Sequence, residues 1–336
     1  MAQSSPSVLV IRLDGIGDAL ALTPLLAALR ERAIPVDLVM RTVNAEIFSS
    51  RAARAVYVAP FTLRSSTGAN LREIKDFGAQ LRENRYSDVL VATEDPGGYR
   101  LAYATGVRNR VGFINGWGKP FKTIWASMLL TGAVVRSAGL DPRAPHECLV
   151  MWELGEHLVG DRPIPREPSM LRPLILQNDV ARGDRIAFQV SDKWERLGIG
   201  FDQVVAALRA AQTVGPVQAI ASESEARYAQ RVADAAGVPI ERFVSLYPWK
   251  EAIARAAALV APDSGAIHVA GMVGTPTVAV FPPVRDFMLQ IMRWAPWAAP
   301  YSALRAEGDW PGKVAEDLQS LLDRSSSIPP SAFTIE

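Results

Sequence analysis

Short runs of apolar residues alternate along the chain with longer segments in which apolar residues recur at the spacing of a helix. This alternation is typical of parallel strands joined by crossover helices, because buried parallel strands are almost wholly apolar while their helices are apolar on one face. It predicts strands over residues 8–13, 36–41, 88–92, 185–190, 217–221, 243–246, 259–261 and 277–281. It predicts helices over residues 20–32, 71–84, 201–211, 224–236 and 264–273. The expected fold class is therefore α/β, with doubly wound parallel sheets.

One stretch, from Gly160 to Pro173, interrupts this alternation with four prolines and mixed charges that follow no period. The length of 336 residues also exceeds the roughly 100–200 residues that one core usually covers. We therefore expect an N-terminal domain over residues 1–160, a linker over residues 161–173 and a C-terminal domain over residues 174–336. Doubly wound domains bind ligands at the carboxyl ends of their strands, so candidate chemistry is sought there.

The composition, 49% hydrophobic and 21% charged, is that of an ordinary globular protein. A formal net charge of +1 provides no global reason to expect a nucleic-acid partner. The single cysteine, Cys148, cannot form an internal disulfide, which suits a reducing cytoplasm and a small buried side chain. The N-terminus lacks a secretory signal, and no apolar run approaches the ~18 residues of a spanning helix. We expect a cytoplasmic protein that contacts a membrane only peripherally.

The first predicted strand passes into its helix through the sequence RLDGIGDALALTP, which carries two glycines and two carboxylates. Gly15 and Gly17 permit a tight turn and a close approach of a ligand to the backbone. Asp18 falls in the first turn of the helix, whose partial positive charge favours a carboxylate. Asp18 is therefore either a helix cap or a functional group. A dinucleotide site is disfavoured, because no third glycine follows at the required spacing.

A second stretch, APDSGAIHVAGMVGTPTVAVF from Ala261 to Phe281, places polar residues where a predicted strand passes into an apolar helix. Asp263 and Ser264 end the strand, and the free backbone N–H groups at the start of the helix can bind an anion or sugar hydroxyls. His268 lies one turn into the helix, near Ser264. It is either a buried structural histidine or a ligand-binding one.

Together these two stretches resemble glycosyltransferase family 9, the heptosyltransferase family of lipopolysaccharide core assembly. The Asp-Ser-Gly-x-x-His motif is the most specific part of the resemblance. The sequence GVRNRVGF, which begins at Gly106, and the pair Lys193–Trp194 also match the family pattern in order and spacing. The resemblance covers roughly residues 8–285. It implies the GT-B fold, in which two Rossmann-like domains face a cleft, the first binding the acceptor and the second the nucleotide sugar.

The resemblance also implies roles for individual residues. Asp18 would be the general base of an inverting transfer, taking the proton of an acceptor hydroxyl as its oxygen attacks the anomeric carbon. The donor, by resemblance an ADP-sugar carrying heptose or a similar sugar, would be bound by Lys193, Glu225, Asp263, Ser264, Gly265 and His268, with Glu223 as the alternative to Glu225 at the ribose. No Asp-x-Asp triplet occurs in the chain, so we expect neither a metal nor another cofactor.

Two features depart from the family pattern. Val190 stands where the family usually has a glycine, in a shortened loop before Lys193, and FPPVRD follows the last predicted strand where the family often has Phe-Gly. Fewer backbone donors would then face the diphosphate. The alternative to a transferase is therefore a degenerate GT-B domain that binds a nucleotide or glycan without turnover, and a nucleotide-sugar epimerase of similar fold fits the motifs less well.

The stretch from Arg100 to Arg136 holds six basic residues and no acid, interleaved with aromatic residues. Cations attract anionic head groups, and tryptophan favours the membrane interface. We predict that an anionic acceptor, lipid-linked or a polysaccharide, contacts this stretch at the inner membrane surface through Arg100, Arg108, Lys119 and Lys122. The alternative is an ordinary exposed loop over a core helix. No recognised nucleic-acid-binding module accompanies the stretch.

Overall fold

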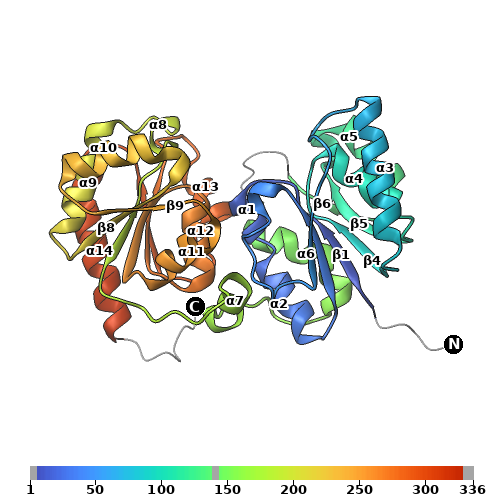
Figure 1. Ribbon diagram of the computed structural model, residues 1–336, viewed down its shortest axis with the longest axis horizontal. Helices are drawn as coiled ribbons and strands as arrows, with labels where there is room; N and C mark the ends of the chain where they lie inside the picture. Colours follow the sequence, from blue (N-terminus) through green and yellow to red (C-terminus); the bar gives the residue numbers. More distant parts are fainter. Residues whose placement is uncertain (1–5, 138–143, 328–336) are drawn as a thin grey trace. The chain divides into compact units, whose positions relative to one another are not determined.

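The computed structural model describes residues 6–137 and 144–327 and divides the chain into two units, Met1–Arg166 and Glu167–Glu336 (Figure 1). Each unit contains a six-stranded sheet in which all neighbouring strands run parallel. Counted within each unit, both sheets have the strand order 3-2-1-4-5-6. This is the doubly wound order of Rossmann folds, so the predicted fold class is confirmed.

The sheet of the first unit is covered by helices on both faces. Its order is β3 (Ala55–Val58), β2 (Val36–Met40), β1 (Val8–Ile11), β4 (Asp88–Val91), β5 (Asn109–Ile114) and β6 (Gly132–Val135). The central strands β1, β2 and β4 are wholly buried, whereas the edge strands β3 and β6 alternate between half-buried and exposed residues. The chain order reverses between β1 and β4, and doubly wound sheets bind ligands at such a reversal.

Six α-helices surround this sheet in the described part of the first unit. They are α1 (Ile16–Leu20), α2 (Thr23–Glu31), α3 (Gly68–Arg82), α4 (Pro96–Ala104), α5 (Pro120–Leu129) and α6 (Glu147–Val159), with short 3₁₀ turns η1 (Thr42–Asn44) and η2 (Gly116–Gly118). α2 packs on α6, while α3 packs on α4 and α4 on α5; Figure 1 shows these two groups on opposite faces of the sheet. Cys148 of α6 is buried, as the composition predicted.

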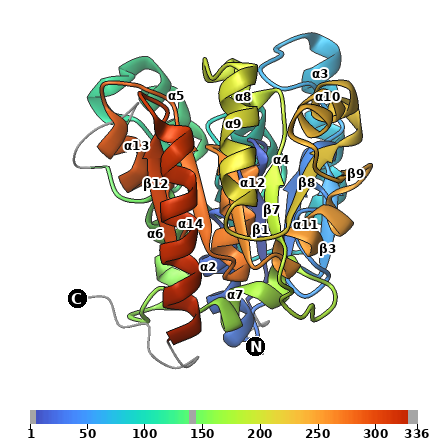
Figure 2. The same cartoon turned by 90° about the vertical axis from the view of Figure 1, so that its left-hand side faces the viewer.

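The second unit repeats this architecture. Its sheet runs in the order β12 (Tyr301–Arg305), β11 (Thr277–Phe281), β10 (Ala258–Pro262), β7 (Ile186–Gln189), β8 (Val217–Ser222) and β9 (Ile240–Phe243). Its helices are α7 (Pro168–Ile175), α8 (Lys193–Arg196), α9 (Phe201–Gln212), α10 (Ala226–Ala236), α11 (Leu246–Arg255), α12 (Gly265–Val273), α13 (Phe287–Trp294) and α14 (Trp310–Ser327), with the 3₁₀ turn η3 (Glu223–Glu225). α14 packs along α9, as Figure 2 shows. Among all the helices described, none is long and apolar enough to cross a bilayer.

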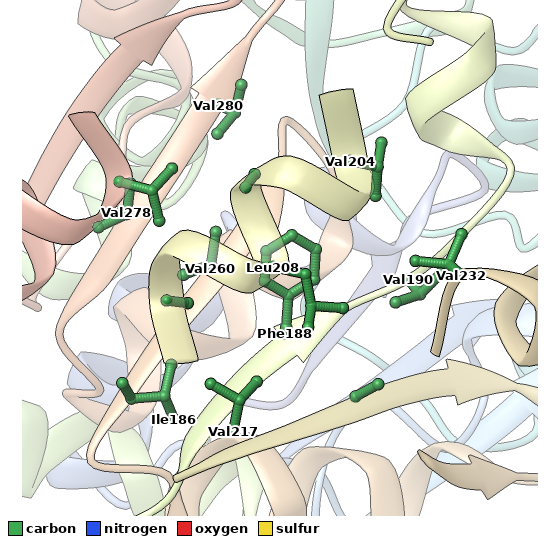
Figure 3. Close-up of a cluster of buried hydrophobic side chains, with 14 of the residues drawn as sticks. Ile186, Phe188, Val190, Val204, Leu208, Val217, Val232, Val260, Val278 and Val280 are labelled. Carbon is green, nitrogen blue, oxygen red and sulfur yellow. The ribbon is translucent and has the colours of Figure 1, made fainter. Parts of the chain in front are cut away.

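Stacked aromatic rings form the centre of the second unit's core. Phe188 stacks on Trp194 with ring centroids 5.9 Å apart, and Trp194 stacks on Trp310 at 5.8 Å. Aliphatic side chains from β7, β8, β10 and β11 complete this core (Figure 3). Val190 belongs to the same core and is fully buried. The valine that replaces the family's glycine is therefore a packing residue.

The first predicted helix begins three residues later than expected, after a separate short helix. Residues 20–32 were expected to form one helix, but α1 ends at Leu20 and α2 begins at Thr23. Pro24 lies at the start of α2, where a residue without a backbone N–H costs no helical hydrogen bond. In the middle of a single helix the same proline would remove one, which explains the break.

Two predictions for the rest of the chain were wrong in position. The strand expected over residues 243–246 is β9, which ends at Phe243, and Leu246 already begins α11. Residues 168–173 of the predicted linker belong to α7, which packs on α12 through a buried leucine-rich face. The prolines of this stretch concealed its helical period, because Pro168 begins α7 and Pro173 lies inside it.

Candidate active site

Asp18 lies just beyond the carboxyl end of β1, in the first turn of α1, where the sequence placed it. Its Oδ2 accepts a hydrogen bond from the backbone N–H of Gly15 at 3.2 Å. Its Oδ1 lies 3.2 Å from Nη2 of Arg12. The side chain is 32% exposed, so it is open to a ligand as well as held by the protein. Asp18 therefore makes a capping contact, and its position at the carboxyl end of β1 keeps it a candidate functional group.

Arg12 is a buried arginine, 1% exposed, that joins the carboxylates around this turn. Besides Asp18, its guanidinium lies 3.4 Å from Asp14 and 3.7 Å from Glu147. Its Nε also donates to the backbone oxygen of Asp18 at 3.0 Å, and its Nη1 donates to the backbone oxygen of Ala92 after β4. Arg12 thus ties the turn after β1 to the end of β4, the two strands between which the chain order reverses.

The surroundings of Asp18 raise the pKa of its carboxyl above the ordinary value. Burial is the largest cause, because it disfavours the charged form, and the negative charges of Asp14 and Glu147 act in the same direction. The positive charge of Arg12 opposes them without cancelling them. A higher pKa makes the ionised Asp18 a stronger base toward a hydroxyl than an exposed aspartate.

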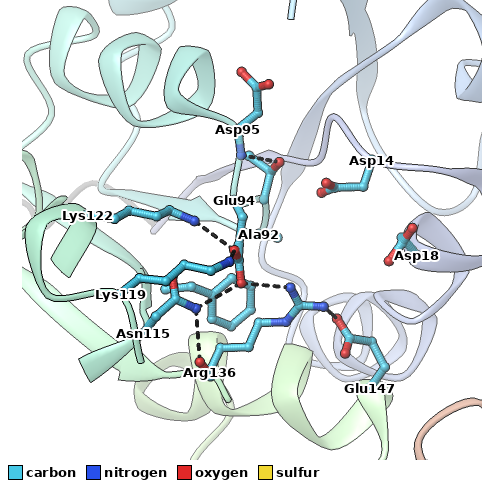
Figure 4. Close-up of polar contacts among 12 residues, drawn as sticks. Asp14, Asp18, Ala92, Glu94, Asp95, Asn115, Lys119, Lys122, Arg136 and Glu147 are labelled. Carbon is cyan, nitrogen blue, oxygen red and sulfur yellow. Dashed lines mark hydrogen bonds and ion pairs between the residues drawn. The ribbon is translucent and has the colours of Figure 1, made fainter. Parts of the chain in front are cut away.

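Glu94, just after β4, contacts three of the six basic residues in the Arg100–Arg136 stretch (Figure 4). Its carboxylate accepts from Lys122 at 2.7 Å, from Arg136 at 3.0 Å and from Lys119 at 3.4 Å. Burial alone would raise the pKa of Glu94, but its hydrogen bonds, led by that from Lys122, hold the pKa far below the ordinary value. Glu94 is therefore ionised throughout the physiological range.

Arg136 extends this network to the carboxylates near Asp18. It lies 2.5 Å from Glu147, which is fully buried and also faces Arg12. The chain of contacts therefore runs from Lys122 through Glu94, Arg136, Glu147 and Arg12 to Asp18. Charges of both signs alternate along it, so each buried ion has an opposite partner, as burial of charge requires.

The four residues predicted to bind the acceptor do not form one group. Lys119 and Lys122 share Glu94, so their charge is partly balanced by an acid that lies outside the acid-free stretch. Arg100 rests on the ring of Trp125, 5.4 Å from its centroid. Arg108 is exposed in the turn before β5. Only the two lysines therefore join the Asp18 network.

The second unit places its predicted site residues at the equivalent reversal, between β7 and β10. Lys193 begins α8 after β7, and Asp263 follows β10. Burial raises the pKa of Asp263, and the nearby charge of Lys193 opposes this rise. Beside them, the hydroxyls of Ser191 and Ser264 are buried, and neither forms a hydrogen bond with any described residue. Buried hydroxyls usually have hydrogen-bond partners, so these two are candidates to bind a polar ligand.

The start of α12 completes this group. Ser264 precedes the helix in an extended conformation, and Gly265 is its first residue. The first N–H groups of a nine-residue helix therefore point toward the same strand ends. His268 lies one turn in, is 8% exposed and meets the ring of Trp294 edge-on, with centroids 5.8 Å apart. Its packing is that of a buried histidine at the rim of the site.

Glu225 holds the loop that carries Lys193. Its Oε1 accepts from the backbone N–H of Asp192 at 3.0 Å, directly before α8. Burial, together with the neighbouring carboxyl of Asp192, raises the pKa of Glu225 to about 7. Glu223, the alternative at the ribose, instead pairs with Arg242 at 3.6 Å. The structure thus brings Glu225, and not Glu223, to the lysine loop.

Half of the residues in the first unit's network were not predicted from the sequence. Arg12 had a readable signal, because it is a charge inside an otherwise apolar run. Glu94 had one as well, because it follows a predicted strand at the edge where ligands bind. Glu147 had none, since it begins a helix that no local pattern links to β1.

Part of the second unit matches a known protein family. The family model described as glycosyltransferase family 9 (heptosyltransferase) matches residues 200–319. That range includes Glu225 and the whole Asp263–His268 motif. Residues 200–319 belong to glycosyltransferase family 9. The predicted resemblance is confirmed, and the matched residues support a glycosyltransferase.

Solved structures of this family share the fold of both units. A family 9 glycosyltransferase from Veillonella parvula matches with a TM-score of 0.73 and 13% identity, over 96% of this chain and 99% of the other. E. coli ADP-heptose LPS heptosyltransferase II matches with a TM-score of 0.69 and 16% identity, over 96% and 100%. E. coli heptosyltransferase WaaC, solved with ADP, matches with a TM-score of 0.66 and 19% identity, over 95% and 98%. These likenesses establish the GT-B fold. A search of curated proteins finds no match.

Proposed function

We propose that this family 9 protein is an inverting, metal-independent glycosyltransferase of cell-envelope glycan synthesis. It transfers heptose or a similar sugar from a nucleoside-diphosphate donor to a hydroxyl of a lipid-linked or polysaccharide acceptor. The observation that carries the proposal is Asp18, a partly exposed carboxylate at the ligand-binding edge of a doubly wound sheet whose pKa is raised by burial. The family match in the second unit supports it.

In this mechanism Asp18 acts as the general base. The acceptor O–H proton passes to the Asp18 carboxylate, the acceptor oxygen forms a bond to the anomeric carbon, and the bond from that carbon to the diphosphate breaks. The electron pair of that bond leaves with the diphosphate. Attack from the face opposite the leaving group inverts the configuration. Arg12 and the backbone N–H of Gly15 hold the carboxylate in place for this transfer.

The second unit would bind the donor. Lys193 provides a positive charge against the diphosphate, and the N–H groups at the start of α12 add hydrogen-bond donors. The hydroxyls of Ser191 and Ser264, unpartnered among the described residues, fit the same role. Asp263 would accept from sugar hydroxyls and Glu225 from the ribose. The similar E. coli protein is an ADP-heptose LPS heptosyltransferase, which supports an ADP-sugar as the donor here.

Binding of a nucleoside diphosphate tests the donor site. Saturating ADP is expected to raise the melting temperature of the purified protein in EDTA, because a ligand at a hundredfold its Kd stabilises the native state by about 2.7 kcal/mol. The variant Lys193→Met should lose most of this shift, while Lys313→Met, which changes an exposed lysine of α14, should keep it. Thermal unfolding followed by fluorescence measures the effect. Unchanged melting with ADP, GDP, UDP, CDP and dTDP would contradict the proposal. It would favour a degenerate domain that no longer binds a nucleotide sugar, in which Val190 has replaced the glycine of the diphosphate loop.

The pH dependence of ADP binding tests Glu225. The pKa of Glu225 is about 7, so its carboxylate is lost as the pH falls through that value. An ionised carboxylate accepts hydrogen bonds from ribose hydroxyls better than a protonated one, so we expect ADP affinity to rise roughly tenfold between pH 6 and pH 8. Calorimetric titration of native protein and Glu225→Gln, side by side, removes the contribution of the phosphate, which titrates in the same range. If both proteins show the same pH dependence, Glu225 does not contact the ribose.

A further inference from the structure

Helix α5 presents apolar side chains to solvent as well as to the core. Ala126 is buried in the first unit's core, and Trp125 and Leu129 pack partly against it. On the outer side, Phe121 is 87% exposed, Ile124 62% and Met128 66%. A surface helix normally has one apolar stripe and a polar outer face, so this second stripe needs a partner that the first unit does not provide within its described residues.

The outer stripe continues beyond the helix. The spacing of Phe121, Ile124 and Met128 places them on one face of α5. Trp117, in the turn η2 directly before the helix, is 96% exposed. Val135, at the end of the edge strand β6, is also exposed and lies beside this turn, with its Cγ1 4.0 Å from where a Cβ on Gly116 would stand. We call Trp117, Phe121, Ile124 and Met128 the α5 outer face.

The sequence around this face is rich in basic residues. The sequence from Arg100 to Arg136, which contains the whole face, includes no acidic residue. Glu94 contacts both Lys119 and Lys122, so one carboxylate balances only part of the charge of the two lysines, while Arg136 has Glu147 as a second partner. Lys119 remains half exposed between Trp117 and Phe121 in the sequence. A partner with negative charge and an apolar layer beneath it fits both properties.

We propose that the α5 outer face inserts into the interfacial layer of an anionic lipid membrane. Tryptophan and phenylalanine favour the boundary between head groups and acyl chains, and nearby lysines bind anionic head groups. A second copy of the chain fits less well, because a stable protein interface needs about 20–30 residues a side and this face has four. The main contact with the membrane is therefore apolar insertion and not charge alone, because Glu94 partly neutralises the lysines.

The proposed membrane binding depends on the α5 outer face and does not require catalysis. It would bring the enzyme close to the lipid-linked acceptor of the proposed function. Binding is therefore measured without any substrate. If the protein fails to bind vesicles but still transfers sugar, only the present inference is wrong. If it binds vesicles but has no transferase activity, the proposed function fails and the membrane surface remains.

Sedimentation with vesicles tests the inference. The native protein is expected to bind vesicles of phosphatidylcholine with one quarter phosphatidylglycerol at low salt, and to bind pure phosphatidylcholine vesicles more weakly. The double variant Phe121→Ser/Met128→Ser should bind the anionic vesicles at least tenfold more weakly. The matched control Val244→Ser changes a side chain that is also exposed, at 93%, but lies in the second unit, and it should bind as the native protein does. Both variants should melt at the native temperature, because the replaced side chains are exposed.

High salt distinguishes apolar insertion into the membrane from electrostatic attraction to its head groups. Raising the salt to 1 M screens exposed charges, so a contact made by lysines alone should be lost entirely. We expect part of the binding to remain in the native protein and none in the double variant. Native protein that ignores anionic vesicles at low salt, or a double variant that binds them as well as the native protein, would overturn the proposal. A native dimer that the double variant converts to a monomer, measured by light scattering, would assign the face to a second copy instead.

Discussion

The variant Asp18→Asn is expected to transfer sugar about 10²–10⁴ times more slowly than the native protein, with its fold intact. Asparagine keeps the size of the side chain and can still accept from the backbone N–H of Gly15, but it cannot take a proton. The loss should appear in kcat and leave donor binding, in the second unit, unchanged. Steady-state rates with a purified donor and acceptor measure it. A variant that is nearly as active as the native protein would show that Asp18 is a helix cap only.

Thermal stability distinguishes the same two roles. A carboxyl whose pKa is higher in the folded than in the unfolded chain binds its proton more tightly when folded, so its ionisation at neutral pH reduces stability. This loss of stability is absent at a pH below the pKa of Asp18 in the unfolded chain. It is fully present at a pH above the pKa of Asp18 in the folded chain. Asparagine removes this cost, so Asp18→Asn should melt at or above the native temperature at pH 7. The capping role is tested by Asp18→Ala, which also removes the acceptor for the Gly15 N–H and should lose about 0.5–2 kcal/mol of stability if the cap contributes.

Asp14 offers the matched control. It lies four residues before Asp18, is exposed to a similar degree and also pairs with Arg12 at 3.4 Å. The variant Asp14→Asn changes the local charge as Asp18→Asn does, but leaves the proposed base in place. We expect its rate to fall less than tenfold. Equal losses in the two variants would mean that the negative charge of the turn, and not a proton acceptor at Asp18, determines the rate.

The variant Arg12→Met is expected to lower the free energy of unfolding by about 3–5 kcal/mol, the usual cost of removing one partner from a buried ion pair. Methionine fits the apolar surroundings of β1 but leaves Glu147, which is fully buried, with Arg136 as its remaining ion-pair partner among the contacts described. The backbone oxygens of Asp18 and Ala92 also lose a donor. Denaturant unfolding measures the change, and Arg12→Lys, which keeps the charge without the planar donors, should lose less.

Arg12 also affects the reaction through Asp18. Its positive charge lowers the pKa of Asp18 against the effect of burial, so removing it raises that pKa further. The base is active only when ionised. The acid side of the pH–rate profile should therefore move to higher pH in Arg12→Met, and less in Arg12→Lys. Loss of stability with an unmoved profile would make Arg12 a structural residue alone.

Several features of this protein follow from the sequence by itself. The alternation of apolar runs and helical spacing identified two α/β domains, because burial of parallel strands and of helix faces leaves a period that short windows reveal. Asp18 and the Asp263–His268 stretch were found for the same reason. A polar residue that ends a buried strand lies at the edge where doubly wound sheets bind ligands. Prolines explain two of the errors, because Pro24 and Pro168 begin helices, whereas residues 20–32 had been predicted as one helix and residues 161–173 as a linker.

Only the tertiary structure decided which charges meet. The stretch from Arg100 to Arg136 contains no acid, yet Glu94 balances its lysines, because β4 and β5 are neighbouring parallel strands whose carboxyl ends lie at one edge. Glu147 meets Arg12 because α6 packs on the same side of the sheet as α2. The outward apolar stripe of α5 likewise became visible only once its other face was seen to be in the core. Spacing along a chain encodes the period of an element, but which side chains meet across elements depends on how strands pair and helices pack.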